Sequence, residues 1–275
     1  MISLARPLRR GAPLRLRIQA SLRHQSTSTP IIAQLPPRWL SDLKARLGHC
    51  MTFGLSPSQN SHAAQILRTL STDWRTLLAG SEGYLTSPER TSLYRWPVAW
   101  GEQDSMGHVN NVMYNRYAES GRVAWAQKYG KFVDPAHGEV WRNLATPRGS
   151  VGMILRKITT EFKFPMKYPD HITVYHKLHA EPGEADDAFM LDVLILSELH
   201  QRPAARCYED CALYDYNLAK KTTMLPWMTN VLRETWRLQK VAKQENNAKV
   251  AELLVQVKKI EQESWDRKDA VEAFG

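Results

Sequence analysis

Three kinds of residue pattern are scarce or missing in this sequence. It has only three cysteines among 275 residues and no acidic residue before Asp42. It also has no apolar run close to the roughly 20 residues that a membrane-spanning helix needs. An odd and small number of cysteines does not make a disulfide framework and is typical of a reducing compartment. The sequence therefore excludes a small disulfide-stapled secreted domain, and we expect no transmembrane segment.

The cysteines also bear on metal binding. Cys207 and Cys211 would share one face of a helix or a strand, which leaves a metal pair as one interpretation. No second pair follows at metal-ligand spacing, and His171, His176 and His179 do not all alternate onto one strand face. We therefore expect buried thiols and predict neither a metal nor another cofactor.

The first 28 residues hold much of the excess basic charge. Six arginines precede Thr27, interspersed with leucines, and serines follow them. Without these arginines the net charge falls from +9 to +3, so the charge balance predicts no nucleic-acid partner. An amphipathic, Arg-rich, acid-free segment is typical of a mitochondrial transit peptide. We predict a presequence over residues 1–28 and a location in the mitochondrial matrix; the alternative is a basic tail that binds acidic surfaces.

Two stretches have apolar residues at helical spacing. Residues 36–91 and 226–275 both show this pattern, and the second stretch has a charge-balanced polar face. We predict that both are helical extensions without visible chemistry. The second extension would pack on its own domain or on a partner subunit, with a membrane-surface helix as the alternative.

Residues 92–225 have a different pattern. A short alternating strand pattern that ends near Pro97 and Trp100 precedes a helical pattern over residues 111–129. Four strand-like runs follow, separated by turn residues: 151–164, 172–178, 189–196 and 204–216. This order predicts one α+β domain, an antiparallel sheet with a helix on one face.

The chemistry-bearing residues gather where the first strand pattern leads into the helix. Asp104 and His108 lie in a loop with Gly107, and Asn110 or Asn111 would cap the helix by accepting a first-turn amide hydrogen. The remaining amides and the positive end of the helix dipole would stabilise a developing oxyanion. A carboxylate beside them can deprotonate a water or attack a carbonyl carbon itself. The loop therefore predicts a site for acyl transfer from a thioester, whose thiolate leaves readily.

The same stretch resembles a known signature. Glu102 to Tyr114 has the pattern acidic-x-Asp-x-x-Gly-His-Val-Asn-Asn-x-x-Tyr, similar to the hydroxybenzoyl-CoA thioesterase family, and plant acyl-ACP thioesterases share its His-Val-Asn-Asn segment. A weaker likeness covers residues 164–172. The resemblance implies a hotdog fold, with an antiparallel sheet wrapped around a long central helix, sites at a subunit boundary, and no metal or redox cofactor.

The resemblance also implies roles for single residues. Asp104 matches the catalytic aspartate of the family. The backbone amide of Asn111 matches the donor to the thioester carbonyl. His108 matches a histidine that is catalytic in some branches and structural in others. We assign Asn110, Val112 and Tyr114 to substrate binding. Met106 stands where the acyl-ACP branch has a catalytic asparagine, which favours acyl-CoA over acyl-ACP as the substrate.

Alternatives remain for the helix and for the whole protein. Glu119 and Arg122 are three apart on one helix face, so we expect an ion pair, with Glu119 as an alternative catalytic carboxylate. The leading hypothesis is a mitochondrial acyl-CoA thioesterase that forms a homodimer or homotetramer. The competing hypothesis is a non-catalytic hotdog protein that serves a mitochondrial complex as a structural or assembly component. A resemblance to hotdog hydratases would require an Asp and a His five positions apart. Asp104 and His108 are four apart, so the sequence does not favour a hydratase.

Overall fold

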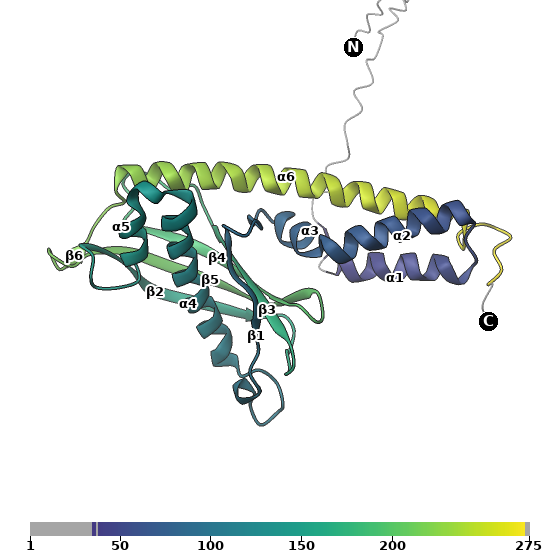
Figure 1. The fold of residues 1–275 in the computed structure, drawn as a ribbon, viewed down its shortest axis with the longest axis horizontal. Helices are drawn as coiled ribbons and strands as arrows, with labels where there is room; N and C mark the ends of the chain where they lie inside the picture. Colours follow the sequence, from purple (N-terminus) through teal and green to yellow (C-terminus); the bar gives the residue numbers. More distant parts are fainter. Residues whose placement is uncertain (1–34, 37, 273–275) are drawn as a thin grey trace, which may run out of the picture. The chain divides into compact units, whose positions relative to one another are not determined.

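The structure is a computed structural model that describes residues 35–36 and 38–272. The predicted presequence, residues 1–28, lies outside these residues. The described residues form one compact unit, in which a sheet, a helix on its inner face and the helical extensions are assembled (Figure 1). None of the helices in the described part is long and apolar enough to cross a membrane.

The sheet is antiparallel throughout. Its strand order is β1-β3-β4-β5-β2. The two-residue strand β6 pairs with β5 and is not part of this order. The bounds are Thr91–Pro97 (β1), Val151–Phe162 (β2), His171–Leu178 (β3), Ala188–Ser197 (β4), Arg202–Asp215 (β5) and Lys220–Lys221 (β6). The strands β1 and β2 are therefore the two edges, and β1 contains the register shifts that Pro97 predicts for an edge strand.

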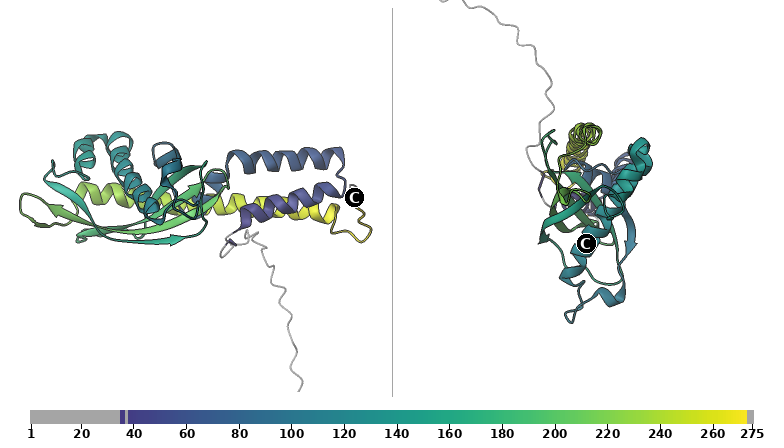
Figure 2. Two further views of the ribbon diagram at one scale, coloured as in Figure 1. Left: turned by 90° about the horizontal axis from the view of Figure 1, so that it is seen from below. Right: turned by 90° about the vertical axis from the view of Figure 1, so that its left-hand side faces the viewer.

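Helix α4 (Asn111–Lys128) lies along one face of the sheet, as Figure 2 shows. Alternate residues of each strand turn toward it and form the inner core, for example Ile172, Val174 and Val193. The helix approaches the sheet closely at Gly121, where an added Cβ would lie 2.7 Å from His176 Cε1. The order of elements and this packing confirm the predicted α+β hotdog architecture.

Shorter helical turns surround α4. A 3₁₀ turn (Trp100–Glu102) precedes it, and a π-helical turn (Tyr129–Val133), a second 3₁₀ turn (Pro135–His137) and helix α5 (Gly138–Asn143) follow it. The sequence predicts a loop from Pro135 to Ser150, so helix α5 was missed. Its six residues are too few to show a helical period.

The extensions are helical, as predicted. The first contains α1 (Trp39–Thr52), α2 (Pro57–Thr72) and α3 (Trp74–Gly80), and the second is the single helix α6 (Pro226–Glu263). Apolar residues of all four helices share one core with Tyr175, Leu194 and Leu196, which project from the outer face of the sheet. The two extensions together, called the extension below, therefore cover part of that face and are continuous with the domain.

Polar contacts fix the extensions in place. Gln239 of α6 satisfies both backbone groups of Leu178, with distances of 2.9 and 3.0 Å. Arg46 of α1 makes two hydrogen bonds of 2.7 Å to Glu261 of α6. Buried backbone groups and carboxylates need such partners.

One predicted ion pair is wrong. Arg122 pairs with Glu209 of β5, and Glu119 is exposed and makes no ion pair with a described residue. Arg122 points into the core and is 7% exposed, so it needs a buried acidic partner, which Glu209 supplies from the sheet. Next to this pair, Ser92 Oγ and His176 Nδ1 are 2.7 Å apart. These polar groups join α4 to three strands across the core.

Both neighbouring thiols lie in that core as predicted. Cys207 and Cys211 project from β5 toward the inner face and are buried. Burial raises the pKa of the Cys207 thiol to about 11 and that of Cys211 to about 12. These groups are therefore neutral and shielded near neutral pH.

Candidate active site

A tight loop carries the predicted catalytic residues. Gln103 and Val109 form an isolated antiparallel bridge, and between them Asp104 N donates to His108 O at 2.8 Å. Gly107 closes the turn by donating to Asp104 O at 3.0 Å, and its φ of +70° is a conformation that favours glycine. The loop is thus a defined structure, and the backbone of His108 helps to fasten it.

The carboxylate of Asp104 is held on one side only. Its Oδ1 accepts hydrogen bonds from the amides of Met106 at 2.8 Å and His108 at 3.4 Å. Among the described residues, its Oδ2 accepts none. One oxygen therefore orients the group, and the other is available to a water or an acyl carbon.

The first turn of α4 has one unused amide. Asn110 is the N-cap, as predicted: its Oδ1 accepts from Val112 N at 3.1 Å, and its backbone oxygen accepts from Met113 N at 2.9 Å. Asn111 N donates to no acceptor within the described part of the chain. Asn111 is thus the residue through which the positive helix end can reach a ligand.

Glu102 ties this loop to the helix. Its Oε2 accepts from Ala99 N at 2.7 Å and from the hydroxyl of Tyr117 at 2.6 Å. Burial, followed by this bond to a carboxylate, raises the pKa of Tyr117 well above its ordinary value, so the hydroxyl stays protonated and keeps donating. Asn110 N donates to Glu102 O at 2.8 Å, which fixes where α4 begins relative to the loop.

The loop, the helix start and the end of β2 enclose a hollow of about 330 Å³. Asp104, His108, Asn111 and Tyr114 line one side, and residues 162–165 line the other. The hydroxyl of Tyr114 lies 3.4 Å from both Phe164 O and Met166 N, so it joins the two walls. We name this site the Asp104 hollow; it combines a carboxylate, an unused helix amide and apolar walls.

The structure brings together four of the seven predicted site residues. Asp104, His108, Asn111 and Tyr114 line the hollow; Asn110 serves as the cap behind it. Val112 and Glu119 are exposed and do not line it. Sequence reasoning missed the wall at Phe162 and Lys163, although the weaker likeness over residues 164–172 begins directly after it.

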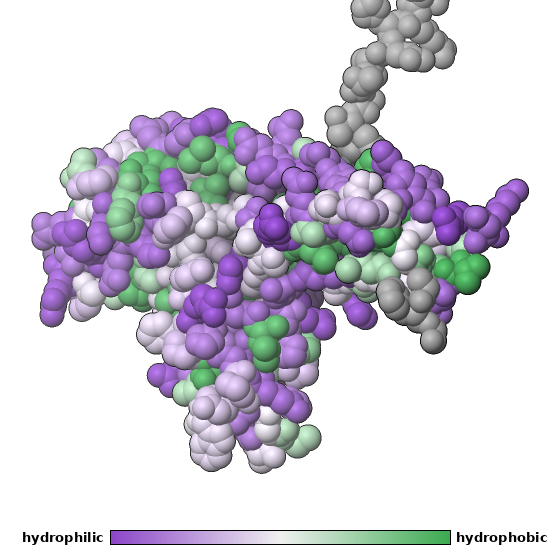
Figure 3. All heavy atoms as spheres, turned by 45° about the vertical axis from the view of Figure 1, so that its right-hand side comes forward, coloured by the Kyte–Doolittle hydropathy of each residue, from purple (hydrophilic) through white to green (hydrophobic). Residues whose placement is uncertain are grey.

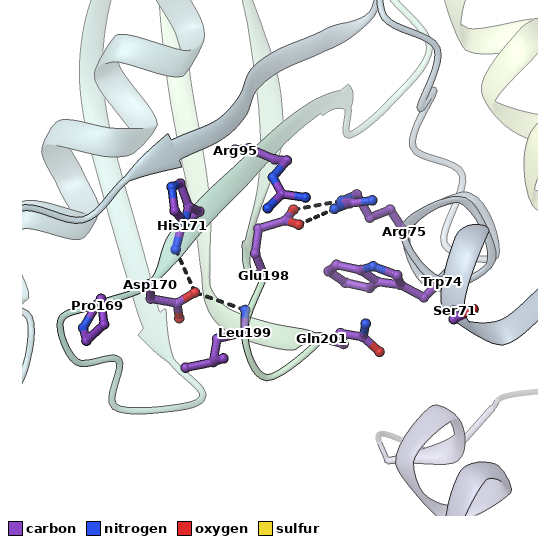
Figure 4. Close-up of a pocket in the computed structure, with 10 residues that line it drawn as sticks. All are labelled: Ser71, Trp74, Arg75, Arg95, Pro169, Asp170, His171, Glu198, Leu199 and Gln201. Carbon is purple, nitrogen blue, oxygen red and sulfur yellow. Dashed lines mark hydrogen bonds and ion pairs between the residues drawn. The ribbon is translucent and has the colours of Figure 1, made fainter. Parts of the chain in front are cut away.

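A second hollow, of about 460 Å³, lies where the extension meets the sheet (Figure 4). Its walls come from the α2–α3 junction, from Arg95 of β1, and from the segments 169–171 and 198–201. Asp170 accepts hydrogen bonds from Ser197, His171 N and Leu199 N, and Glu198 is held by Arg75 and Thr173. We name this site the Arg95 hollow, because Arg95 makes no ion pair within the described residues.

Neither hollow has the donor set of a metal site. Residues 35–36 and 38–272 contain no group of three or more His, Cys, Asp or Glu side chains arranged to hold a metal ion.

No curated protein matches the chain. Among solved structures, a thioesterase from Thermus thermophilus solved with coenzyme A and zinc is 16% identical, with a TM-score of 0.39, over 52% of this chain and 92% of its own. DHNA-CoA thioesterase from Staphylococcus aureus is 13% identical, with a TM-score of 0.42, over 56% of this chain and 94% of its own.

The family comparison concerns the same region as the loop and the sheet. Residues 98–232 match the model of the thioesterase-like superfamily. This match begins just before the Asp104 loop and ends in the first turns of α6, so it spans every strand except β1. Residues 98–232, which contain the Asp104 loop and strands β2 to β6, are thus similar to the thioesterase-like superfamily.

Proposed function

We propose that this protein hydrolyses an acyl-CoA thioester to the free acid and CoA. The observation that carries the proposal is the pairing, in one hollow, of an aspartate with one unused oxygen and a helix start with one unused amide. The superfamily match over residues 98–232 supports this reaction class, and the Glu102 to Tyr114 pattern supports the hydroxybenzoyl-CoA thioesterase branch.

The reaction needs one proton acceptor and one anion donor. Asp104 takes a proton from a water whose oxygen attacks the thioester carbonyl carbon. The carbonyl oxygen becomes negative and is stabilised by the amide of Asn111 and the helix dipole. Collapse of the tetrahedral intermediate breaks the C–S bond, and the proton on Asp104 passes to the departing CoA thiolate, which restores the carboxylate. The alternative mechanism is direct attack by Asp104 on the carbonyl carbon, which expels the CoA thiolate and forms an anhydride that water then hydrolyses.

His108 and Tyr114 would shape the hollow around the acyl group. His108 lines it, and its backbone fixes the Asp104 turn. Tyr114 is 2% exposed, and its hydroxyl is engaged with the β2–β3 loop, so its ring rather than its hydroxyl meets the substrate. Asn110 acts through the cap that orients the helix start.

A second copy of the chain would complete the site. Strand β2 is a 12-residue edge strand, and it ends at Phe162, which lines the hollow. Ile154 and Phe162 are exposed apolar residues on this strand. Unpaired edge strands of this length join readily to another strand, which supports a homodimer or homotetramer assembled along β2.

The proposed location is the mitochondrial matrix. It is supported by the acid-free, Arg-rich composition of residues 1–28 and by the buried, unpaired cysteines.

Hydrolysis of a panel of acyl-CoA thioesters by the full chain tests the proposal. We expect turnover with at least one member and a loss of about 100-fold or more in kcat for Asp104→Asn, the effect of removing a general base. Asp269→Asn, an exposed aspartate near the end of the chain, is the matched control. Turnover that is unchanged in Asp104→Asn would remove Asp104 from the mechanism.

A structural or assembly role is the second candidate. It is favoured by the extension, whose core with the outer sheet face lies away from the Asp104 hollow. Comigration of the protein with a large mitochondrial assembly, together with no turnover on any acyl chain length, would support this role and contradict catalysis.

A further inference from the structure

The β1 edge of the sheet exposes an unusual group of large side chains. Five of them are 49–74% exposed, and we name them the aromatic edge: Tyr94, Trp96, Trp100, Tyr168 and Leu199. In Figure 3, weakly polar and apolar residues gather on the protrusion that contains the loop after β1. Single exposed apolar residues are ordinary, but a local group of them marks an interaction surface.

Hydrogen bonds fasten together the segments that carry these residues. Val98 N donates to Asp170 O at 3.0 Å, and Tyr168 N donates to Gln103 Oε1 at 3.1 Å. Leu199 N donates to Asp170 Oδ1 at 3.0 Å. The loops that carry Tyr168 and Leu199 are therefore fastened to the end of β1, beside the Arg95 hollow.

Two cations at this edge, Arg95 and Lys167, make no ion pair with any described residue. The two carboxylates that line the Arg95 hollow, those of Asp170 and Glu198, are already engaged by donors of the fold. Figure 4 shows the side chain of Arg95 pointing into the space above Glu198. An incoming anionic group would thus find the guanidinium of Arg95 available, beside carboxylates whose oxygens already accept hydrogen bonds.

The backbone of β1 argues against another strand as the occupant. Pro97 has no amide hydrogen, Arg95 has a φ of +49°, and the pairing with β3 shifts register twice. Such an edge does not accept an added strand. A second copy paired along β2 would also leave β1 open, because β1 and β2 are opposite edges of the sheet.

We propose that the aromatic edge and the Arg95 hollow together dock on the surface of an anionic phospholipid membrane. Indole and phenol rings favour the headgroup level of a bilayer, where one end of the ring is apolar and the other is wet. Arg95 would hold a headgroup phosphate, which the planar guanidinium matches with two hydrogen bonds. Lys167 adds attraction to the negative surface.

A fluorophore on the edge provides a local test in the full chain. All three native thiols are buried, so Trp100→Cys can be labelled selectively with an environment-sensitive dye. Leu218→Cys, on the turn between β5 and β6 and 61% exposed, is the matched control. The Leu218 label also controls for vesicle binding through the Arg-rich residues before Thr27, because such tethering would not favour the Trp100 label.

We expect a blue shift of the Trp100 label with phosphatidylcholine vesicles that contain phosphatidylglycerol, and none with phosphatidylcholine alone. The Leu218 label should not respond. Arg95→Gln in the Trp100-labelled chain should weaken partitioning about fivefold, from the roughly 1 kcal/mol that one basic residue contributes at such a surface. Trp96→Ser should weaken it further, and high salt should abolish it.

Four results would overturn the inference. Equal responses of both labels, or none, would remove the edge as the contact. A shift with sodium phosphate alone, at matched ionic strength, would make the hollow a site for free anions. A shift that grows with protein concentration without vesicles would assign the edge to a second copy. None of these readouts needs turnover, so the inference is tested separately from the proposed function.

Discussion

The Asp104 hollow and the Arg95 hollow contain the same kinds of group in opposite states of use. In the Arg95 hollow, the carboxylates of Asp170 and Glu198 are held by hydroxyl, amide and guanidinium donors. In the Asp104 hollow, one carboxylate oxygen and one helix amide have no partner among the described residues. Acids that are fully bonded by the fold stabilise it, whereas an acid oriented through one oxygen retains the capacity to react.

The largest effect should come from removing the unused amide without disturbing the helix. Asn111 is the first residue of α4, a position that tolerates proline, and Asn110 has the extended backbone (φ −58°, ψ 139°) that a residue before proline prefers. We expect Asn111→Pro to lower kcat by about 100- to 1000-fold, as loss of one oxyanion donor does.

The side chain at position 111 can be tested separately. Asn111→Ala keeps the amide and should retain most of the turnover. Equal losses in Asn111→Pro and Asn111→Ala, with unchanged thermal unfolding, would contradict the role of the amide.

In the Arg95 hollow, the corresponding change should reduce stability and spare catalysis. Glu198→Gln breaks a pair with Arg75 in which the two side chains are 6% and 16% exposed. We expect a loss of about 3 kcal/mol in the free energy of unfolding, the low end for a buried pair that loses one partner. Urea denaturation measures this loss. A clear fall in kcat with little loss of stability would contradict the distinction between the two hollows.

Two helix caps allow a finer comparison. Asn110→Ala at α4 and Ser56→Ala at α2 each remove a side-chain acceptor from a first turn, which costs about 1 kcal/mol. We expect similar losses of stability in both variants but reduced turnover only in Asn110→Ala, because that cap orients the Asp104 hollow. Matched activities of the two variants would show that the cap has no role in the reaction.

The smallest effect concerns acidification of the extension. The hydrogen bonds from Arg46 hold the pKa of Glu261 below its ordinary value. The Arg46–Glu261 pair therefore stabilises the fold at pH values above the ordinary carboxyl pKa. This stabilisation is lost as the pH falls below about 5 toward the lowered pKa. The free energy of unfolding of Glu261→Gln, from urea denaturation, should therefore fall less over this pH range than that of the unmodified chain, by about 0.5–1 kcal/mol for a partly exposed pair. Parallel pH profiles would contradict this.

Much of the architecture could be predicted from local patterns. Alternation and turn residues located four strands to within two residues at each end, and residue type narrowed the cap of α4 to Asn110 or Asn111, of which the structure uses Asn110. The loop motif brought Asp104, His108 and Asn111 to one hollow because the three are close in sequence.

Contacts between distant residues could not be predicted in this way. Arg122 and Glu209 are 87 positions apart, and only the register of β5 brings them together, whereas the helical spacing pointed to Glu119. The packing of the extension against Tyr175, Leu194 and Leu196 likewise depends on which face of the sheet α3 and α6 contact. The Arg95 hollow arises from that same docking, so no single segment contains a signal for it.

Helix α6 contributes to two separate apolar cores. Met228 and Leu232 pack beside α4 and the inner sheet face, and Val250 and Val257 pack among α1, α2 and α3. Its 38 residues make it a beam of about 57 Å at 1.5 Å per residue. Because both cores depend on this one helix, neither can unfold without disrupting it, and heating should yield one calorimetric peak. Cutting the chain near Lys243 should split that peak in two.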